Sequence, residues 1–105
     1  MTGRVHIDIP KKRIEAFCEK WKIREFALFG SVLREDFNPH SDIDVLVTFS
    51  EDAEHSLFDL VHMEDELEAL FGRSVDVVSR RGVEASRNYI RKNMILNSAE
   101  AIYAS

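Results

Sequence analysis

Apolar residues recur at helical spacing near the start of the chain. Ile14, Phe17, Cys18 and Trp21 follow the i, i+3, i+4, i+7 pattern of one helix face. Pro10 suits the first turn of such a helix, because the N–H group that it lacks would have no intrahelical partner there. The pattern predicts an amphipathic helix over about residues 10–22, with Cys18 as a buried structural thiol.

Polar signals mark both ends of a second predicted helix. Ser56 followed by Asp59 resembles a capping box, and Gly72 is a natural stop at the C-terminal end. Between them we expect one apolar face made of Leu57, Leu60, Val61, Leu67, Leu70 and Phe71. The acidic run from Glu64 to Glu68 is interpreted as a solvated face of this helix.

Three short segments have the composition of strands. Residues 43–49 are rich in β-branched and aromatic residues and are almost continuously apolar, which predicts a central strand covered on both faces. Residues 25–29 and 74–79 are predicted to form two further strands. A short helix is expected to follow the first of these, over residues 31–34.

The last third of the chain completes the predicted order of elements. Residues 83 to about 93 are expected to be helical, and residues 100–105 to form either a strand or a helical tail. The order helix, strand, strand, helix, strand, helix predicts an α/β (α+β) fold, with a small mixed β-sheet packed with helices. With 105 residues, the chain is expected to be one domain spanning 1–105.

Charge and cysteine content narrow the function classes. The net charge of -5 argues against a nucleic-acid-binding surface, which is usually basic. A single cysteine permits no intrachain disulfide and fits a reducing cytoplasm. No apolar stretch approaches the ~20 residues needed to span a bilayer. We therefore expect a cytoplasmic protein that binds neither nucleic acid directly nor a membrane.

Two carboxylates stand at the start of the predicted central strand. Asp42 and Asp44 are two residues apart, so both point to the same face of the sheet. Two like charges so close repel each other unless a cation lies between them, and carboxylate oxygens are suitable ligands for Mg²⁺. Asp76 interrupts an apolar strand in the same way and can complete the set. Three carboxylates can hold two metal ions about 4 Å apart for in-line nucleotidyl transfer, with Asp76 available as general base.

A Gly-Ser turn precedes these carboxylates. Gly30 ends a predicted strand and Ser31 opens the next helix, and such a turn exposes backbone N–H groups that bind anions. The Ser31 hydroxyl can donate to a phosphate oxygen, and Arg34 can offer a charge-assisted fork to a triphosphate.

Each of these features also has a purely structural interpretation. Asp42 and Asp44 can be polar residues that end a turn, and Asp76 can be a solvent-facing residue of an edge strand. Gly30 and Ser31 can be an ordinary turn with a helix N-cap. It is the combination of the three features that favours chemistry.

That combination resembles the minimal nucleotidyltransferases (MNT) of the DNA polymerase β-like nucleotidyltransferase superfamily. The stretch "FGSVLREDFNPHSDIDVLVTF" and the later "SVDVVS" carry the resemblance. By position, the resemblance implies metal ligands and catalytic carboxylates at Asp42, Asp44 and Asp76. It also implies nucleotide-binding residues, which are Gly30, Ser31, Arg34 and Ser41.

The resemblance also implies a reaction and a partner. Short members of this family act as antitoxins beside a HEPN-type RNase toxin, and transfer AMP from ATP to a tyrosine hydroxyl of that toxin. The chain is thus expected to be a Mg²⁺-dependent protein adenylyltransferase with ATP as substrate, two Mg²⁺ ions and a HEPN-type toxin as partner. The alternative is a non-catalytic antitoxin that neutralises its partner by binding alone.

Overall fold

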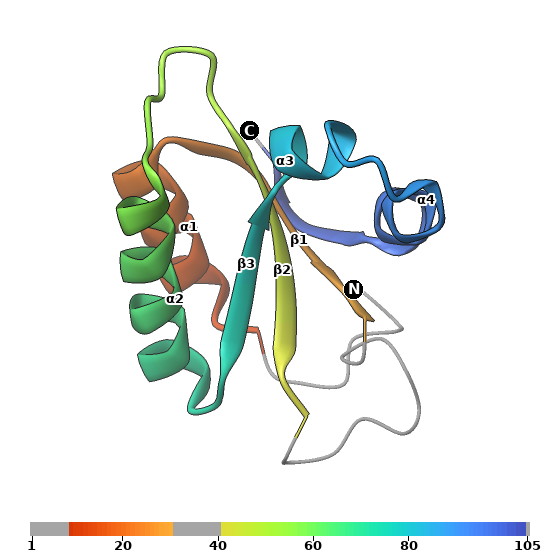
Figure 1. Ribbon diagram of the computed structural model, residues 1–105. Coiled ribbons are helices and arrows are strands. Elements are labelled where there is room, and N and C mark those ends of the chain that lie inside the picture. Colours follow the sequence, from red (N-terminus) through yellow and green to blue (C-terminus); the bar gives the residue numbers. More distant parts are fainter. Residues whose placement is uncertain (1–8, 31–40, 105) are drawn as a thin grey trace.

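The computed structural model describes residues 9–30 and 41–104, which form helices and strands (Figure 1). They follow in the order α1 (Lys11–Trp21), β1 (Ile23–Phe29), β2 (Ile43–Phe49), α2 (Leu57–Phe71), β3 (Val75–Ser79), α3 (Arg80–Glu84), α4 (Tyr89–Ser98) and β4 (Glu100–Ala104). None of the described helices is long and apolar enough to cross a membrane.

The described strands form one sheet in the order β3-β2-β1-β4. β2 pairs parallel with β3, whereas β1 pairs antiparallel with both β2 and β4, so the sheet is mixed. α1 and α2 cover one face, and α3 and α4 lie on the other (Figure 1). The predicted α/β class and the small mixed sheet are confirmed.

β2 is central and is packed on both faces, as its apolar run predicts. Val45 and Val47 belong to the larger core cluster beneath α1 and α2, and Leu46 belongs to the smaller one beneath α3 and α4. Ile95 of α4 closes the smaller cluster. Burial of apolar side chains on both sides therefore holds the strand that carries Asp44.

α1 and the start of α2 agree closely with the sequence. Cys18 is fully buried, and burial, followed by the charges of Glu15 and Glu19, raises the pKa of its thiol to about 12. At the start of α2, Ser56 and Asp59 form the expected capping box. The predicted structural thiol and the capping box are both confirmed.

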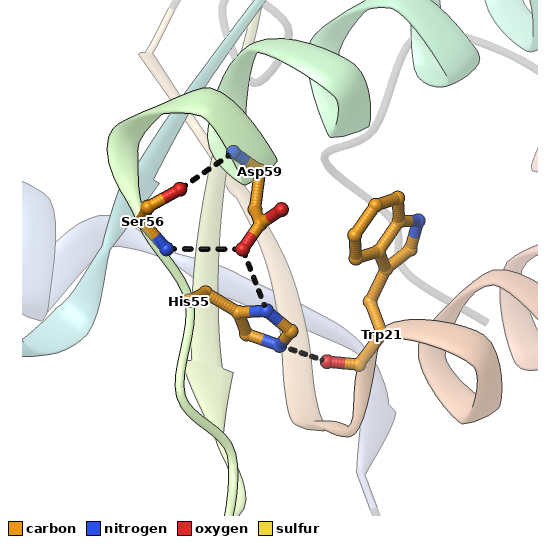
Figure 2. A network of polar contacts seen from close by, with 4 residues as sticks. All are labelled: Trp21, His55, Ser56 and Asp59. Carbon is orange, nitrogen blue, oxygen red and sulfur yellow. Dashed lines mark hydrogen bonds and ion pairs between the residues drawn. The ribbon is translucent and has the colours of Figure 1, made fainter.

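A histidine joins the capping box to the end of α1, as Figure 2 shows. His55 Nε2 lies 2.7 Å from the carbonyl oxygen of Trp21, and His55 Nδ1 lies 3.4 Å from Asp59 Oδ2. The same Asp59 oxygen accepts the backbone N–H of Ser56 at 3.0 Å. This network fixes the first turn of α2 against α1.

Two sequence-based predictions about helices need correction. Four residues of the predicted apolar face of α2 do lie on the core, and they are Leu60, Leu67, Leu70 and Phe71. However, Leu57 is 79% exposed and Val61 is 53% exposed, and the fully buried Met63 was not predicted. The helix predicted over residues 83–93 is instead two helices, α3 and α4. The break occurs because the Asn88 side chain accepts the Arg91 N–H and caps a new helix, as asparagine favours.

The remaining differences concern the ends of elements. β1 begins at Ile23, two residues earlier than expected. Of the two alternatives for the end of the chain, the strand is confirmed by β4, and the helical tail is not. The short helix predicted over residues 31–34 lies outside the described residues.

Candidate functional site

The parallel pairing of β2 and β3 brings two of the predicted carboxylates together. Asp44 of β2 and Asp76 of β3 are direct register partners. Asp44 is half-buried and Asp76 is exposed. Register partners on neighbouring strands present their side chains to the same face, and like charges placed directly opposite each other destabilise a sheet. The fold therefore places these two aspartates side by side on neighbouring strands.

Gly30 lies against the first of these carboxylates. It directly follows β1, whose last residue, Phe29, is the register partner of Asp44. Gly30 has φ +76°, and a Cβ atom at this position would come within 2.3 Å of Asp44 Oδ2. The backbone conformation favours glycine, and a side chain on residue 30 would force the Asp44 carboxylate to move. The glycine of the Gly-Ser motif and the second aspartate of the D-x-D motif are thus in contact.

The start of β2 is held by the turn between α2 and β3. Ile43 N–H donates to the Ser74 carbonyl at 2.9 Å, and Arg73 Nη1 donates to the Ser41 carbonyl at 3.4 Å. Asp42, between Ser41 and Ile43, is exposed to solvent. These bonds anchor the backbone on both sides of Asp42 next to the beginning of β3, which carries Asp76.

Two of the predicted site residues cannot be placed. Ser31 and Arg34 lie outside the described residues, so their positions relative to Asp44 stay predictions. The structure therefore brings together Gly30, Asp44 and Asp76, with Ser41 and Asp42 at the start of the same strand.

The backbone of the described residues places carboxylate side chains close together on neighbouring strands, an arrangement suited to binding a cation. Asp44 and Asp76 face each other across one strand pair, and Asp42 precedes Asp44 by two residues. However, within residues 9–30 and 41–104 no three His, Cys, Asp or Glu side chains gather closely enough to hold a metal ion. The strand register places Asp44 beside Asp76, but the described side chains do not by themselves form a complete ligand set. The metal site stays a prediction.

Two glutamates near this site were misinterpreted from the sequence. Glu64 and Glu68 of α2 do not form a solvated face. Their carboxylates accept hydrogen bonds from the backbone N–H groups of Val77 at 2.8 Å and Val75 at 3.2 Å. The signal available in the sequence was the i, i+4 spacing of the two glutamates. On a helix this spacing is similar in length to the distance between alternate residues of a strand.

A groove lies beside the C-terminal half of β3. It has a volume of about 280 Å³, and Val78, Ser79 and Val83 are among the residues that line it. Arg91 and Lys92 of α4 also line the groove and give it positive charge. None of Asp42, Asp44 and Asp76 is among the residues that line this groove, so it is separate from the candidate carboxylate site.

Comparison with known proteins gives a consistent result. A family model described as the nucleotidyltransferase domain matches residues 10–101. A relative from Methanocaldococcus jannaschii, MJ0435, has the provisional name of protein adenylyltransferase. It is 35% identical over 95 residues, which cover 90% of this chain and 96% of that protein.

Solved structures share the fold at lower identity. A toxin–antitoxin structure with AMP-PNP superposes with a TM-score of 0.71 at 17% identity, covering 92% of this chain and 75% of the other. A tri-AMPylated HEPN toxin from Shewanella oneidensis in complex with an MNT antitoxin gives a TM-score of 0.62 at 16% identity, covering 90% and 70%. At these identities the likeness shows the fold alone.

Proposed function

Because this chain belongs to the nucleotidyltransferase domain family, we propose that it transfers AMP from ATP to a tyrosine hydroxyl of a HEPN-type RNase toxin and so acts as its antitoxin. The observation that carries this proposal is the direct pairing of Asp44 with Asp76, with Gly30 packed against the Asp44 carboxylate. Two like charges directly opposite each other lower the stability of a sheet. A cation-dependent reaction explains why the arrangement persists.

The roles of the residues follow from their positions. Gly30 and Ser31 would bind the triphosphate through backbone N–H groups and a hydroxyl, with Arg34 and Ser41 supporting it. Asp42, Asp44 and Asp76 would hold Mg²⁺. Bound Mg²⁺ would neutralise charge on the triphosphate and activate the attacking hydroxyl.

The reaction is a balanced displacement. The tyrosine oxygen forms a bond to the α-phosphorus of ATP, and the bond from that phosphorus to the bridging β-phosphate oxygen breaks. Pyrophosphate leaves, and the tyrosine proton passes to the Asp76 carboxylate, which acts as general base. Asp76 suits this role because it is exposed at the edge strand, where an acceptor from another chain can reach it.

The partner is proposed from the relatives. The Shewanella oneidensis structure joins an MNT antitoxin with an AMPylated HEPN toxin, and MJ0435 has a name that refers to protein adenylylation. An acceptor on another protein can approach the exposed side chain of Asp76 directly. Since ATP is the proposed donor, we place this reaction in the cytoplasm.

Intact-mass measurement of the partner tests the proposal. A HEPN-type toxin encoded beside this protein is incubated with it, ATP and Mg²⁺, and its mass is expected to rise by whole adenylyl groups. The Asp42→Asn, Asp44→Asn double variant should leave the mass unchanged. An unchanged mass with the wild-type protein, under conditions where it binds ATP, would contradict the proposed transfer.

One observation favours the second candidate function, neutralisation by binding alone. Large apolar side chains are exposed on two helices, and they are Leu57, Phe58 and Val61 on α2 and Tyr89, Ile90 and Met94 on α4. Exposed apolar groups of this kind are frequent at protein–protein interfaces. If the aspartate double variant still protects cells from the toxin, binding is sufficient and transfer is dispensable.

A further inference from the structure

The edge strand β3 is fastened to α2 by two carboxylates. Glu64 Oε2 accepts the Val77 N–H at 2.8 Å, and Glu68 Oε2 accepts the Val75 N–H at 3.2 Å. Both glutamates are half-buried. Bonds from a backbone N–H to a charged carboxylate are among the stronger hydrogen bonds in proteins. β3 therefore has strong partners on its outer side, although β2 is its one neighbour within the described sheet.

The spacing of the two glutamates matches the spacing of the two amides. Residues four apart on a helix are separated by about 6 Å along its axis. Residues two apart on a strand are separated by about 6.6 Å. Because the order of contacts is reversed, with Glu64 on Val77 and Glu68 on Val75, α2 runs antiparallel to β3 and both bonds can form at once.

Asp76 lies between the two amides that are held. Its register partner on the other side is Asp44. Mutual repulsion of these carboxylates acts to separate β3 from β2 at this point, and an edge strand has no second strand to resist that force. The two glutamate bonds tie the backbone of β3 to α2, whose Met63 and Leu67 pack in the same core cluster as the central strand β2, and so fix where β3 lies.

We infer that Glu64 and Glu68 are positioning residues that hold Asp76 opposite Asp44 for cation binding. This inference rests on the proposed function, since it assumes that Asp76 is a metal ligand and general base. Neither glutamate touches substrate. They act through the backbone of β3, and partners of this kind commonly change metal affinity or activity by about 10–100-fold when removed.

A purely structural role for the glutamates is the competing explanation. Side chains that cover an edge strand also prevent it from pairing with another chain. Such a role would change stability but not the affinity for Mg²⁺. The affinity for Mg²⁺ and the turnover number therefore separate the two explanations.

The variants are Glu64→Met and Glu68→Met, which keep the length of the side chain but remove the acceptor. Glu64→Gln is the conservative variant, because its amide oxygen can still accept the Val77 N–H. Glu66→Met is the matched control. Glu66 lies on the same helix and accepts a hydrogen bond from Trp21 Nε1 at 3.0 Å, but its partner is on α1 rather than β3.

Amide hydrogen exchange is measured first, on the full chain without metal. The Val75 and Val77 amides of the wild-type protein should be protected as well as amides inside the sheet. Glu64→Met should remove protection at Val77, and Glu68→Met should remove it at Val75. This measurement needs no activity, and rapid exchange of both amides in the wild-type protein would overturn the inference even if every variant failed to fold.

Mg²⁺ affinity and kinetics are measured next. Mg²⁺ is titrated in the presence of α,β-methylene-ATP, which cannot donate AMP. Glu64→Met and Glu68→Met should weaken Mg²⁺ binding and lower kcat by about 10-fold, with an unchanged KM for ATP. Glu64→Gln should restore both values, and Glu66→Met should change neither.

The outcomes keep the two proposals distinguishable. If the wild-type protein transfers no AMP, the proposed function fails, whereas weaker Mg²⁺ binding in the glutamate variants would still support the positioning role. If transfer occurs but Glu64→Met binds Mg²⁺ and turns over like the wild-type protein despite an exposed Val77 amide, the positioning role is refuted and the proposed function stands.

Discussion

The backbone of Gly30 is packed against the carboxylate of Asp44, so that a Cβ atom on residue 30 would come within 2.3 Å of Asp44 Oδ2. These two residues belong to different motifs and are separated by a stretch of 13 intervening positions in the printed sequence. The antiparallel pairing of Phe29 with Asp44 brings them together. Gly30 and Asp44 are therefore neighbours in the fold, and substitutions at Gly30 should affect the carboxylate as well as the local backbone.

Gly30→Ala should abolish AMP transfer, because the added methyl group displaces the Asp44 carboxylate. Gly72→Ala is the matched control. Gly72 has a similar φ of +72°, but a Cβ atom there meets nothing within 4 Å. A left-handed backbone costs a non-glycine residue about 1–2 kcal/mol, so both variants should lose at least this much stability in urea unfolding. Transfer by Gly72→Ala at an undiminished rate, with none by Gly30→Ala, is expected, and equal activities would show that the contact with Asp44 is irrelevant.

Asp76→Asn should have opposite effects on stability and on activity. Without metal, removing one of two opposed carboxylates should raise the free energy of unfolding by about 0.5 kcal/mol. Removing the general base should slow transfer by about 100-fold or more. The order of stabilities should reverse when Mg²⁺ and α,β-methylene-ATP are added, because ligands stabilise the form that binds them. Thermal unfolding with and without these ligands measures the reversal, and a variant less stable under both conditions would contradict it.

Asp59 should make the stability of the protein depend on pH in the acid range. The hydrogen bond from the Ser56 N–H, and secondarily His55, hold the pKa of Asp59 below its ordinary value of 3.8. A pKa lowered by folding means that the stabilisation is present above pH 3.8 and is lost as pH falls toward the lower pKa of the folded state. Asp59→Asn should therefore make the free energy of unfolding depend less on pH in the acid range. Asp65→Asn, the same change at an exposed position of the same helix, is the matched control and should not reproduce this effect.

The two sides of α2 should respond very differently to truncation. Leu67 is fully buried in the larger core cluster, whereas Leu57 is 79% exposed. Leu67→Ala should cost about 2–5 kcal/mol of stability, and Leu57→Ala should change stability by less than about 0.5 kcal/mol. Urea unfolding of both variants measures this. Similar losses of stability for the two substitutions would show that Leu57 belongs to the buried apolar face of α2, as the sequence alone predicted.

The sequence predicted the strands well because their burial follows from short-range composition. The apolar run of β2 specified a central strand, and the lone Asp76 identified its neighbour. The helices were predicted less well wherever a tertiary contact overrides periodicity. Leu57 and Val61 fit a helical face by spacing, yet the sheet lies beneath Met63 and Leu67. Leu57 is left at the surface for that reason.

The positions of Asp44 and Asp76 on strands were predictable from the sequence, but their register was not. Spacing placed Asp42 and Asp44 together at the start of one strand, and the carboxylate that interrupts the apolar residues 74–79 added Asp76, which the resemblance also implied. The direct register of Asp44 with Asp76 depends on how β3 aligns beside β2, and the sequence does not encode that alignment locally. The same holds for Glu64 and Glu68. Their acidic run indicates solvent, and only the position of α2 beside the β3 edge turns them into partners of Val77 and Val75.

The central claim is that the α-phosphate of ATP moves to the partner toxin. Parallel reactions with ATP labelled at the α- or the γ-phosphate test this claim most directly, with the Asp44→Asn variant as the inactive control. The account predicts α-label on a tyrosine of the HEPN-type partner, and γ-label in released pyrophosphate alone. Label from the γ-phosphate on the partner, or equal α-labelling by wild-type protein and Asp44→Asn, would contradict it.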